Sequence, residues 1–198
     1  MNRLEAVLRA APQDLADLRL RWALVGGLAV SARTEPRFTR DIDLVIAVRD
    51  DRDAERAIHA LQQRGYQVHA LVEQEAAGRL ATARLVPKGD DAAGVVLDIL
   101  FASSGIETEI VEAADPLEIL PGLRVPVACV AHLIALKLLS RDDRTRPQDR
   151  VDLAQLLRVA TPADLDLARA AVALIHARGF QRDRHLTADL ERLIDRGI

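Results

Sequence analysis

Several residue types are scarce in this 198-residue chain, and each scarcity excludes a class of function. The single cysteine, Cys129, cannot form an internal disulfide, and the five histidines show no paired ligand spacing. We therefore expect neither a zinc site nor a cysteine nucleophile. Aromatic residues make up only 3% of the chain, too few for the stacking platforms of single-strand-binding proteins. No apolar run approaches the ~20 residues of a membrane span, and the first residues do not resemble a signal peptide, so we expect a cytoplasmic protein without a membrane partner.

Hydrophobic residues are plentiful at 49%, which is enough for a folded core. The formal net charge is −3, so any contact with nucleic acid must come from local basic patches. Charge is distributed unevenly, with a net −5 over residues 1–127 and a net +2 over residues 128–198. The charge change coincides with a change from mixed patterns to helical ones. We therefore predict a core domain over 1–127 and a helical domain over 128–198.

The hydrophobic pattern predicts an α/β protein with a mixed sheet, followed by a helical bundle. A first amphipathic segment around residues 4–18 contains Pro12, where we expect an interruption. We expect strands at 21–25, 41–48, 66–72, 80–87 and 95–102, helices at 28–33 and 50–64, short extended pieces within 116–127, and helices from 128 to the end.

A glycine turn and two nearby aspartates form the most informative motif. Gly26 and Gly27 follow a short buried strand and precede a helix, a geometry that presents backbone N–H groups to phosphates. Asp41 and Asp43 begin the next strand. Because side chains alternate faces along a strand, the two carboxylates point the same way and can share a pair of divalent cations.

A third acidic residue, Asp98, lies among apolar residues in the strand at 95–102. An ionised carboxylate is costly there unless it binds a metal or a partner. Asp98 could complete the ligand set of a two-Mg²⁺ site for nucleotidyl transfer, for which clustered hard oxygens are required. The alternative is a structural carboxylate that is paired with an arginine.

Taken together, Gly26-Gly27, Arg37-x-Thr39-x-Asp41-x-Asp43 and a lone strand aspartate resemble the polymerase-β-like nucleotidyltransferases. The segments around Lys137 and Asp149-x-x-Asp152 narrow the resemblance to AbiEii-type toxins, which include the MenT toxins of mycobacteria. These motifs span residues 26–153. The turn has Gly-Gly where many superfamily members have Gly-Ser, so its backbone amides must contact the phosphate alone.

The resemblance implies metal binding by Asp41 and Asp43, phosphate contact by Lys137 and an active-site role for Asp152. It leaves Asp149 either structural or facing the substrate. It also implies a toxin that adds nucleotides, pyrimidines in several members, from an NTP to the 3′ end of tRNA. Such a toxin blocks aminoacylation and translation and has a cognate antitoxin protein.

Lys137 has some support from the residues themselves. It is one of two lysines in a chain that otherwise uses arginine, and a compact ammonium suits phosphate. Arg141, one helical turn further on, would share its face and help bind the nucleotide, and nearby arginines such as Arg144 and Arg146 extend the positive charge. A snorkelling surface lysine is the alternative.

Thr39 lies two residues before Asp41, so its hydroxyl shares the face of the carboxylates and can contact the nucleotide. Phosphorylation there would add roughly −1.5 to −2 charge and abolish nucleotide binding. A Thr39→Glu variant with wild-type activity would refute this regulatory phosphosite.

Two further functions stay open from the sequence. One is nucleotidyl transfer to a small molecule, such as an aminoglycoside, or to a protein hydroxyl. The other is a non-catalytic nucleotide- or RNA-binding regulator, which would not need all of these carboxylates together with Lys137.

Overall fold

The computed structural model of the chain describes residues 3–74, 77–87, 89, 94–142, 145 and 147–196. Arg144 and Arg146 lie outside these residues. One mixed seven-stranded sheet has the strand order β3-β4-β5-β2-β1-β7-β6. Its strands are β1 (Trp22–Val25), β2 (Asp41–Ile46), β3 (Gln67–Gln74), β4 (Arg79–Val86), β5 (Val96–Leu100), β6 (Asp115–Leu120) and β7 (Leu123–Val127).

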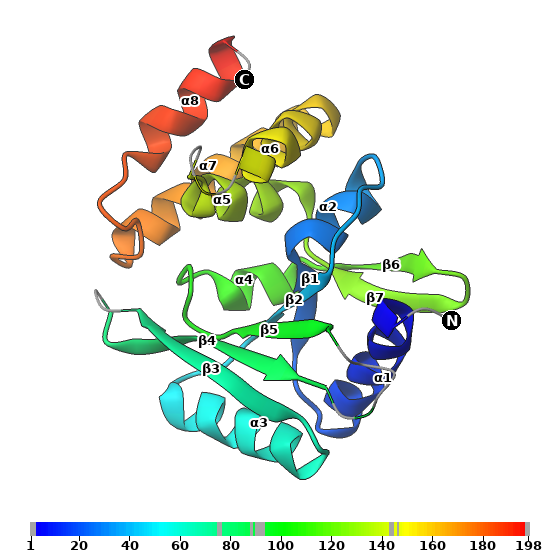
Figure 1. Cartoon of the computed structure of the whole chain (residues 1–198). Coiled ribbons are helices and arrows are strands. Elements are labelled where there is room, and N and C mark those ends of the chain that lie inside the picture. The colour runs from blue at the N-terminus through cyan, green and yellow to red at the C-terminus, as the bar shows by residue number, and fades with distance from the viewer. Residues whose placement is uncertain are drawn as a thin grey trace.

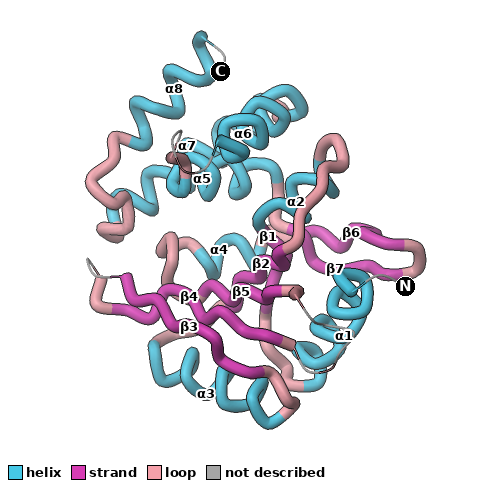
Figure 2. The backbone as a smooth tube through the Cα atoms, in the orientation of Figure 1, coloured by secondary structure: helices cyan, strands magenta, loops and turns pink. Residues whose placement is uncertain are grey.

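Helices surround this sheet and form the C-terminal part of the chain (Figures 1 and 2). They are α1 (Arg3–Asp17), α2 (Gly26–Arg33), α3 (Asp51–Gln63), α4 (Glu107–Glu112), α5 (Val130–Ser140), α6 (Pro147–Val159), α7 (Pro162–Ala177) and α8 (Leu186–Arg196). In Figure 1, α2 and α4 lie between the sheet and α5–α8, whereas α3 lies on the far side of the sheet. The predicted α/β architecture, a mixed sheet followed by helices, is confirmed.

One local prediction is wrong, and one helix was not predicted. Helix α1 continues through Pro12, because Val7, Leu8, Ala11 and Leu15 are buried on both sides of it and packing outweighs the missing hydrogen bond. The short helix α4 was not expected, since six residues carry too little periodicity to stand out.

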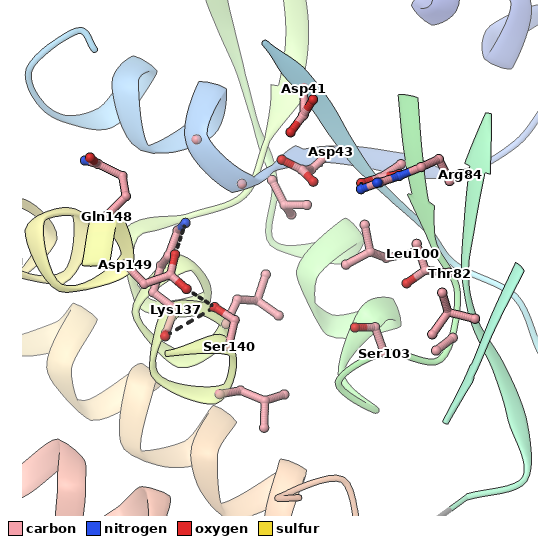
Figure 3. A pocket seen from close by; sticks show the side chains of 18 of the residues that line it. Asp41, Asp43, Thr82, Arg84, Leu100, Ser103, Lys137, Ser140, Gln148 and Asp149 are labelled. Carbon is pink, nitrogen blue, oxygen red and sulfur yellow. Dashed lines mark hydrogen bonds and ion pairs between the residues drawn. The ribbon is translucent and has the colours of Figure 1, made fainter. Parts of the chain in front are cut away.

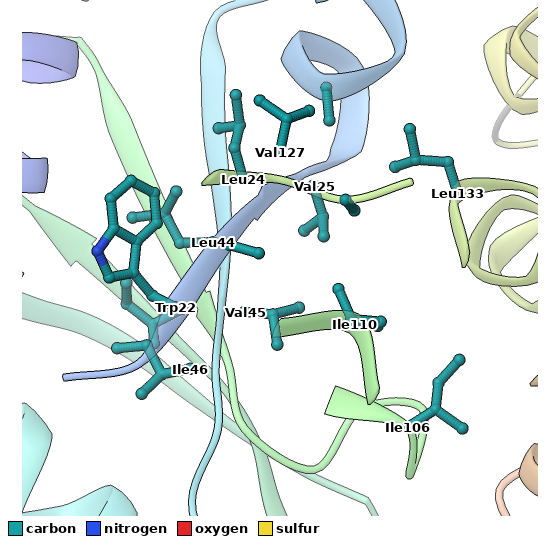
Figure 4. Close-up of a cluster of buried hydrophobic side chains, with 14 of the residues drawn as sticks. Trp22, Leu24, Val25, Leu44, Val45, Ile46, Ile106, Ile110, Val127 and Leu133 are labelled. Carbon is teal, nitrogen blue, oxygen red and sulfur yellow. The ribbon is translucent and has the colours of Figure 1, made fainter. Parts of the chain in front are cut away.

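A single cluster of buried hydrophobic side chains runs from the sheet into the helices. Figure 4 shows Val25 and Val45 of the sheet on the side of Ile110 of α4 and Leu133 of α5. The sheet and the C-terminal helices therefore share one core, and the division near residue 127 stays a prediction. Among the described helices, none is long and apolar enough to cross a membrane.

Candidate active site

A cleft of about 880 Å³ separates the sheet from the C-terminal helices. Side chains of β2, β4 and β5 line one wall, residues of α5 and α6 line the other, and the first residues of α2 lie at the glycine turn. Figure 3 shows Asp41, Asp43 and Arg84 on the sheet side and Lys137, Ser140 and Asp149 on the helical side. The cleft thus brings together groups that are far apart in the sequence.

The glycine turn and the aspartate strand fit against each other closely. Gly26 has a φ of +65°, and a Cβ built on it would lie 2.0 Å from Oδ2 of Asp43. Only glycine tolerates both the left-handed backbone and this close approach. Val25, the N-cap residue of α2, makes no side-chain cap hydrogen bond, and Gly26 and Gly27 at the start of this helix line the cleft.

Asp43 also belongs to a row of paired residues that crosses the sheet. It pairs in register with Val25 of β1 and with Asp98 of β5, and Asp98 in turn pairs with Arg84 of β4. Residues opposite each other in a ladder point to the same face. Asp98 therefore lies beside Asp43 on the cleft side.

The Asp98 carboxylate is held by the Arg84 guanidinium. Arg84 donates from Nε to Oδ1 at 2.9 Å and from Nη2 to Oδ2 at 2.7 Å. Hydrogen bonding to Asp98 and its charge raise the pKa of Arg84, and Asp41 and Asp43 add to the effect. This is the arrangement of a structural carboxylate, so the metal role of Asp98 stays a prediction.

On the helical wall, Lys137 lies between two carboxylates of α6. Its Nζ is 2.7 Å from Oδ1 of Asp149 and 2.8 Å from Oδ2 of Asp152. Asp149 and Asp152 are three residues apart and share one helical face. Ser140 Oγ donates to the second oxygen of Asp149 at 2.9 Å. Lys137 is thus fixed at the end of α5 rather than extended into solvent.

Arg37 links this helical wall to the segment before β2. Its Nε and Nη2 donate to the two oxygens of Asp152 at 2.7 and 2.8 Å. Asp152 is fully buried, at 0% exposure. Burial alone would raise the pKa of Asp152, but hydrogen bonds from Arg37 and Lys137 hold it below its usual value. Gly27 leaves room for Arg37, since a Cβ there would lie 2.6 Å from Nη2.

A family model described as "Nucleotidyl transferase AbiEii toxin, Type IV TA system" matches residues 8–197. The chain belongs to the AbiEii nucleotidyltransferase toxin family. No curated protein matches the chain. An antigenic nucleotidyltransferase-like protein from Paracoccidioides brasiliensis has a similar crystal structure, with a TM-score of 0.55, 21% identity and coverage of 96% of this chain and 92% of that one. The solution structure of the antibiotic-resistance factor ANT(2″)-Ia gives a TM-score of 0.51 at 16% identity, covering 96% and 93%. These two likenesses show a shared nucleotidyltransferase fold.

Within this AbiEii-family cleft, most of the predicted site residues come together. Those lining it are Gly26, Gly27, Thr39, Asp41, Asp43, Asp98 and Lys137, together with Asp149. Asp152 lies directly behind this lining, where it contacts Lys137. Arg141 follows the last residue of α5 and is absent from the described lining. Their roles in binding and catalysis stay predictions.

Sequence reasoning missed several cleft residues of this AbiEii-family chain. Arg37 was quoted only as part of a motif and was given no role of its own. Its place two residues before Thr39 could have put it on the cleft face, because side chains alternate along an extended segment. Arg84 could have been found only from the register of β4 with β5. Ser140 and Arg182 also line the cleft. Arg182 reaches it from the connection between α7 and α8, where it donates to the carbonyl oxygen of Ser103 at 2.9 Å.

Nucleotidyltransferases of this fold generally use divalent metal ions, and the donor chemistry of the sheet wall fits such ions. Asp41 and Asp43 offer hard carboxylate oxygens from one strand face. Acidic groups outnumber Arg84 there, so a polyphosphate would be repelled without a cation between them. Among the described side chains, no group of three or more His, Cys, Asp or Glu is arranged to hold a metal ion, in keeping with the pairing of Asp98.

Proposed function

We propose that this AbiEii-family chain transfers a nucleotide, in our expectation a pyrimidine nucleotide, from an NTP to the 3′ end of tRNA, with two bound Mg²⁺ ions. Such a modification blocks aminoacylation and hence translation, and a cognate antitoxin protein neutralises it. One observation carries the proposal. Asp41 and Asp43 on β2 lie across one cleft from Lys137 on α5, with the glycine turn at the same cleft.

The reaction forms a bond between the acceptor hydroxyl oxygen and the α-phosphorus, breaks the bond to pyrophosphate and releases the hydroxyl proton. Asp41 and Asp43 would hold the metal ions, which offset negative charge in the transition state. Backbone amides at Gly26 and Gly27 would bind phosphate oxygens, and Lys137 would contribute a positive charge to the leaving pyrophosphate. Asp98 could join the ligand set only by releasing Arg84.

The two carboxylates that pair with Lys137 would position its side chain. Asp149 and Asp152 would keep its ammonium at the cleft wall, so that little side-chain ordering remains when the nucleotide arrives. Arg37 would in turn fix Asp152. The net positive charge of residues 128–198 supports a polynucleotide acceptor on this side.

The test incubates the purified protein with total tRNA, Mg²⁺ and each α-labelled NTP in turn. We expect label in the tRNA band with one or two NTPs, lost in Asp41→Ala and kept in Glu55→Ala, which removes an exposed carboxylate of α3. Absence of label with every NTP would refute tRNA as the acceptor and favour a protein or small-molecule hydroxyl. Growth inhibition that survives Asp41→Ala would instead favour the non-catalytic regulator.

A further inference from the structure

One aromatic side chain differs from all others in this chain. Trp22, Tyr66, Phe101 and Phe180 are buried, whereas Phe38 is 80% exposed. Phe38 is also the most exposed of the large hydrophobic residues in the described part of the chain. A core role for Phe38 is therefore excluded, and its ring is available to a ligand.

Phe38 lies in the segment that leads into β2, between two residues that line the cleft. Arg37 and Thr39 line the cleft, as do Asp41 and Asp43, while Phe38 belongs to the exposed side of the same segment. This alternation is that of an extended chain. Phe38 therefore stands on the outer side of the cleft's edge, one residue away from groups inside it.

The backbone around Phe38 is held in place from two directions. Arg37 Nη1 donates to the carbonyl oxygen of Phe38 at 3.2 Å, and the same guanidinium is fixed to Asp152 of α6. The backbone N–H of Arg37 donates to Oγ of Ser31 in α2 at 3.2 Å. An exposed ring on an anchored backbone binds a ligand with a smaller entropy loss than a ring on a loose loop.

Arg40 supplies the second part of the surface. Its guanidinium carbon lies 5.5 Å from the centroid of the Phe38 ring, in a cation–π contact. An aromatic ring beside a guanidinium matches one nucleotide of a single strand, because the base stacks on the ring and the cation attracts its phosphate. A small acceptor bound wholly within the cleft would not reach this outer side.

We propose that Phe38 and Arg40 form a stacking subsite for an unpaired nucleobase of the polynucleotide acceptor, where the strand passes over the cleft's edge. The proposal rests on the proposed function and adds to it the contact that holds the acceptor strand. Every base can stack on an aromatic ring, so this subsite binds the strand without selecting its sequence.

Steady-state kinetics with total tRNA test the subsite. We expect Phe38→Ala to raise KM for tRNA roughly tenfold, the usual size of one lost base stack. Both kcat and KM for the NTP should stay near wild type, and Phe38→Tyr should restore KM for tRNA. Leu71→Ala, which truncates an exposed apolar side chain of β3, is the matched control. An unchanged KM for tRNA in Phe38→Ala, with transfer intact, would overturn the subsite and leave the proposed function standing.

A binding measurement decides the question even where no transfer is seen. Phe38→Trp places an exposed indole at the subsite, and the wild type, with its buried Trp22, gives the baseline. We expect an RNA hairpin with a single-stranded 3′ overhang to quench the fluorescence of Phe38→Trp, and a blunt hairpin to quench it less. Equal quenching by both hairpins, or none, would overturn the subsite. Quenching by the overhang without transfer to tRNA would refute the proposed function alone.

Discussion

Replacing Gly26 by alanine should separate the effect of backbone strain from the effect of a displaced Asp43 carboxylate. Gly26 has a φ of +65°, and a left-handed conformation costs a residue with a Cβ about 1–2 kcal/mol. The new Cβ would also lie 2.0 Å from Oδ2 of Asp43, whereas ordinary contact begins at 3.4 Å. The Asp43 carboxylate must therefore move by more than an ångström from its place in the cleft.

The two effects have different magnitudes and different readouts. A misplacement of about 1 Å in a catalytic group costs on the order of 10²-fold in rate, so we expect Gly26→Ala to lose that much activity. Its free energy of unfolding should fall by about 1–2 kcal/mol from strain alone. Label transfer from the NTP measures the first effect, and urea unfolding measures the second.

Gly122 provides the matched control. Its φ is +74°, and a Cβ built there would meet nothing within 4 Å. Gly122→Ala should therefore lose a similar amount of stability while keeping its activity. If Gly26→Ala folds and transfers nucleotides at the wild-type rate, then the close contact with Asp43 does not position the carboxylate, and the reasoning fails.

Four further predictions concern ionisable side chains. Asp152→Ala should cost about 3–5 kcal/mol of stability in urea unfolding, because it leaves Arg37 and Lys137 facing each other. Arg37→Ala should cost less, about 1.5–3 kcal/mol, since Lys137 still pairs with Asp152; equal losses would contradict this. Arg84→Gln should free the Asp98 carboxylate and tighten Mn²⁺ binding in a calorimetric titration, whereas unchanged affinity would argue that Asp98 takes no part. Burial raises the pKa of Glu107, so stability should fall as pH rises from the unfolded pKa of about 4.3 through the folded one. Glu107→Gln keeps an accepting oxygen and should flatten that fall above the unfolded pKa, and an unaltered slope would assign the fall to another group.

Local patterns were enough to predict one half of the cleft. Gly26-Gly27, Asp41 and Asp43 lie within 18 residues of one another, and their geometry depends on one turn and on alternation along one strand. The sequence also placed Asp98 in a shared ligand set with Asp41 and Asp43, but its position directly beside Asp43 comes from the pairing of β2 with β5.

The other half depends on pairings that no local pattern encodes. Arg37 and Asp152 are 115 residues apart, and their contact requires α6 to pack beside the segment before β2. The Arg84 partner of Asp98 is set by the register between β4 and β5. Lys137 and Asp152 were found through family resemblance, since a lysine and an aspartate near a helix are too common to indicate a site alone.

The hydrophobic core shared by the sheet and the C-terminal helices also affects how the molecule unfolds. Leu133 and Leu138 of α5 belong to the same buried cluster as Leu24 and Leu44 of the sheet, so neither half can lose its partner without exposing apolar surface. The chain should therefore melt in one cooperative calorimetric transition. We expect a fragment that ends at residue 127 to aggregate, because it would expose the apolar surface that the C-terminal helices cover. The cleft therefore forms only when the sheet and these helices are present together.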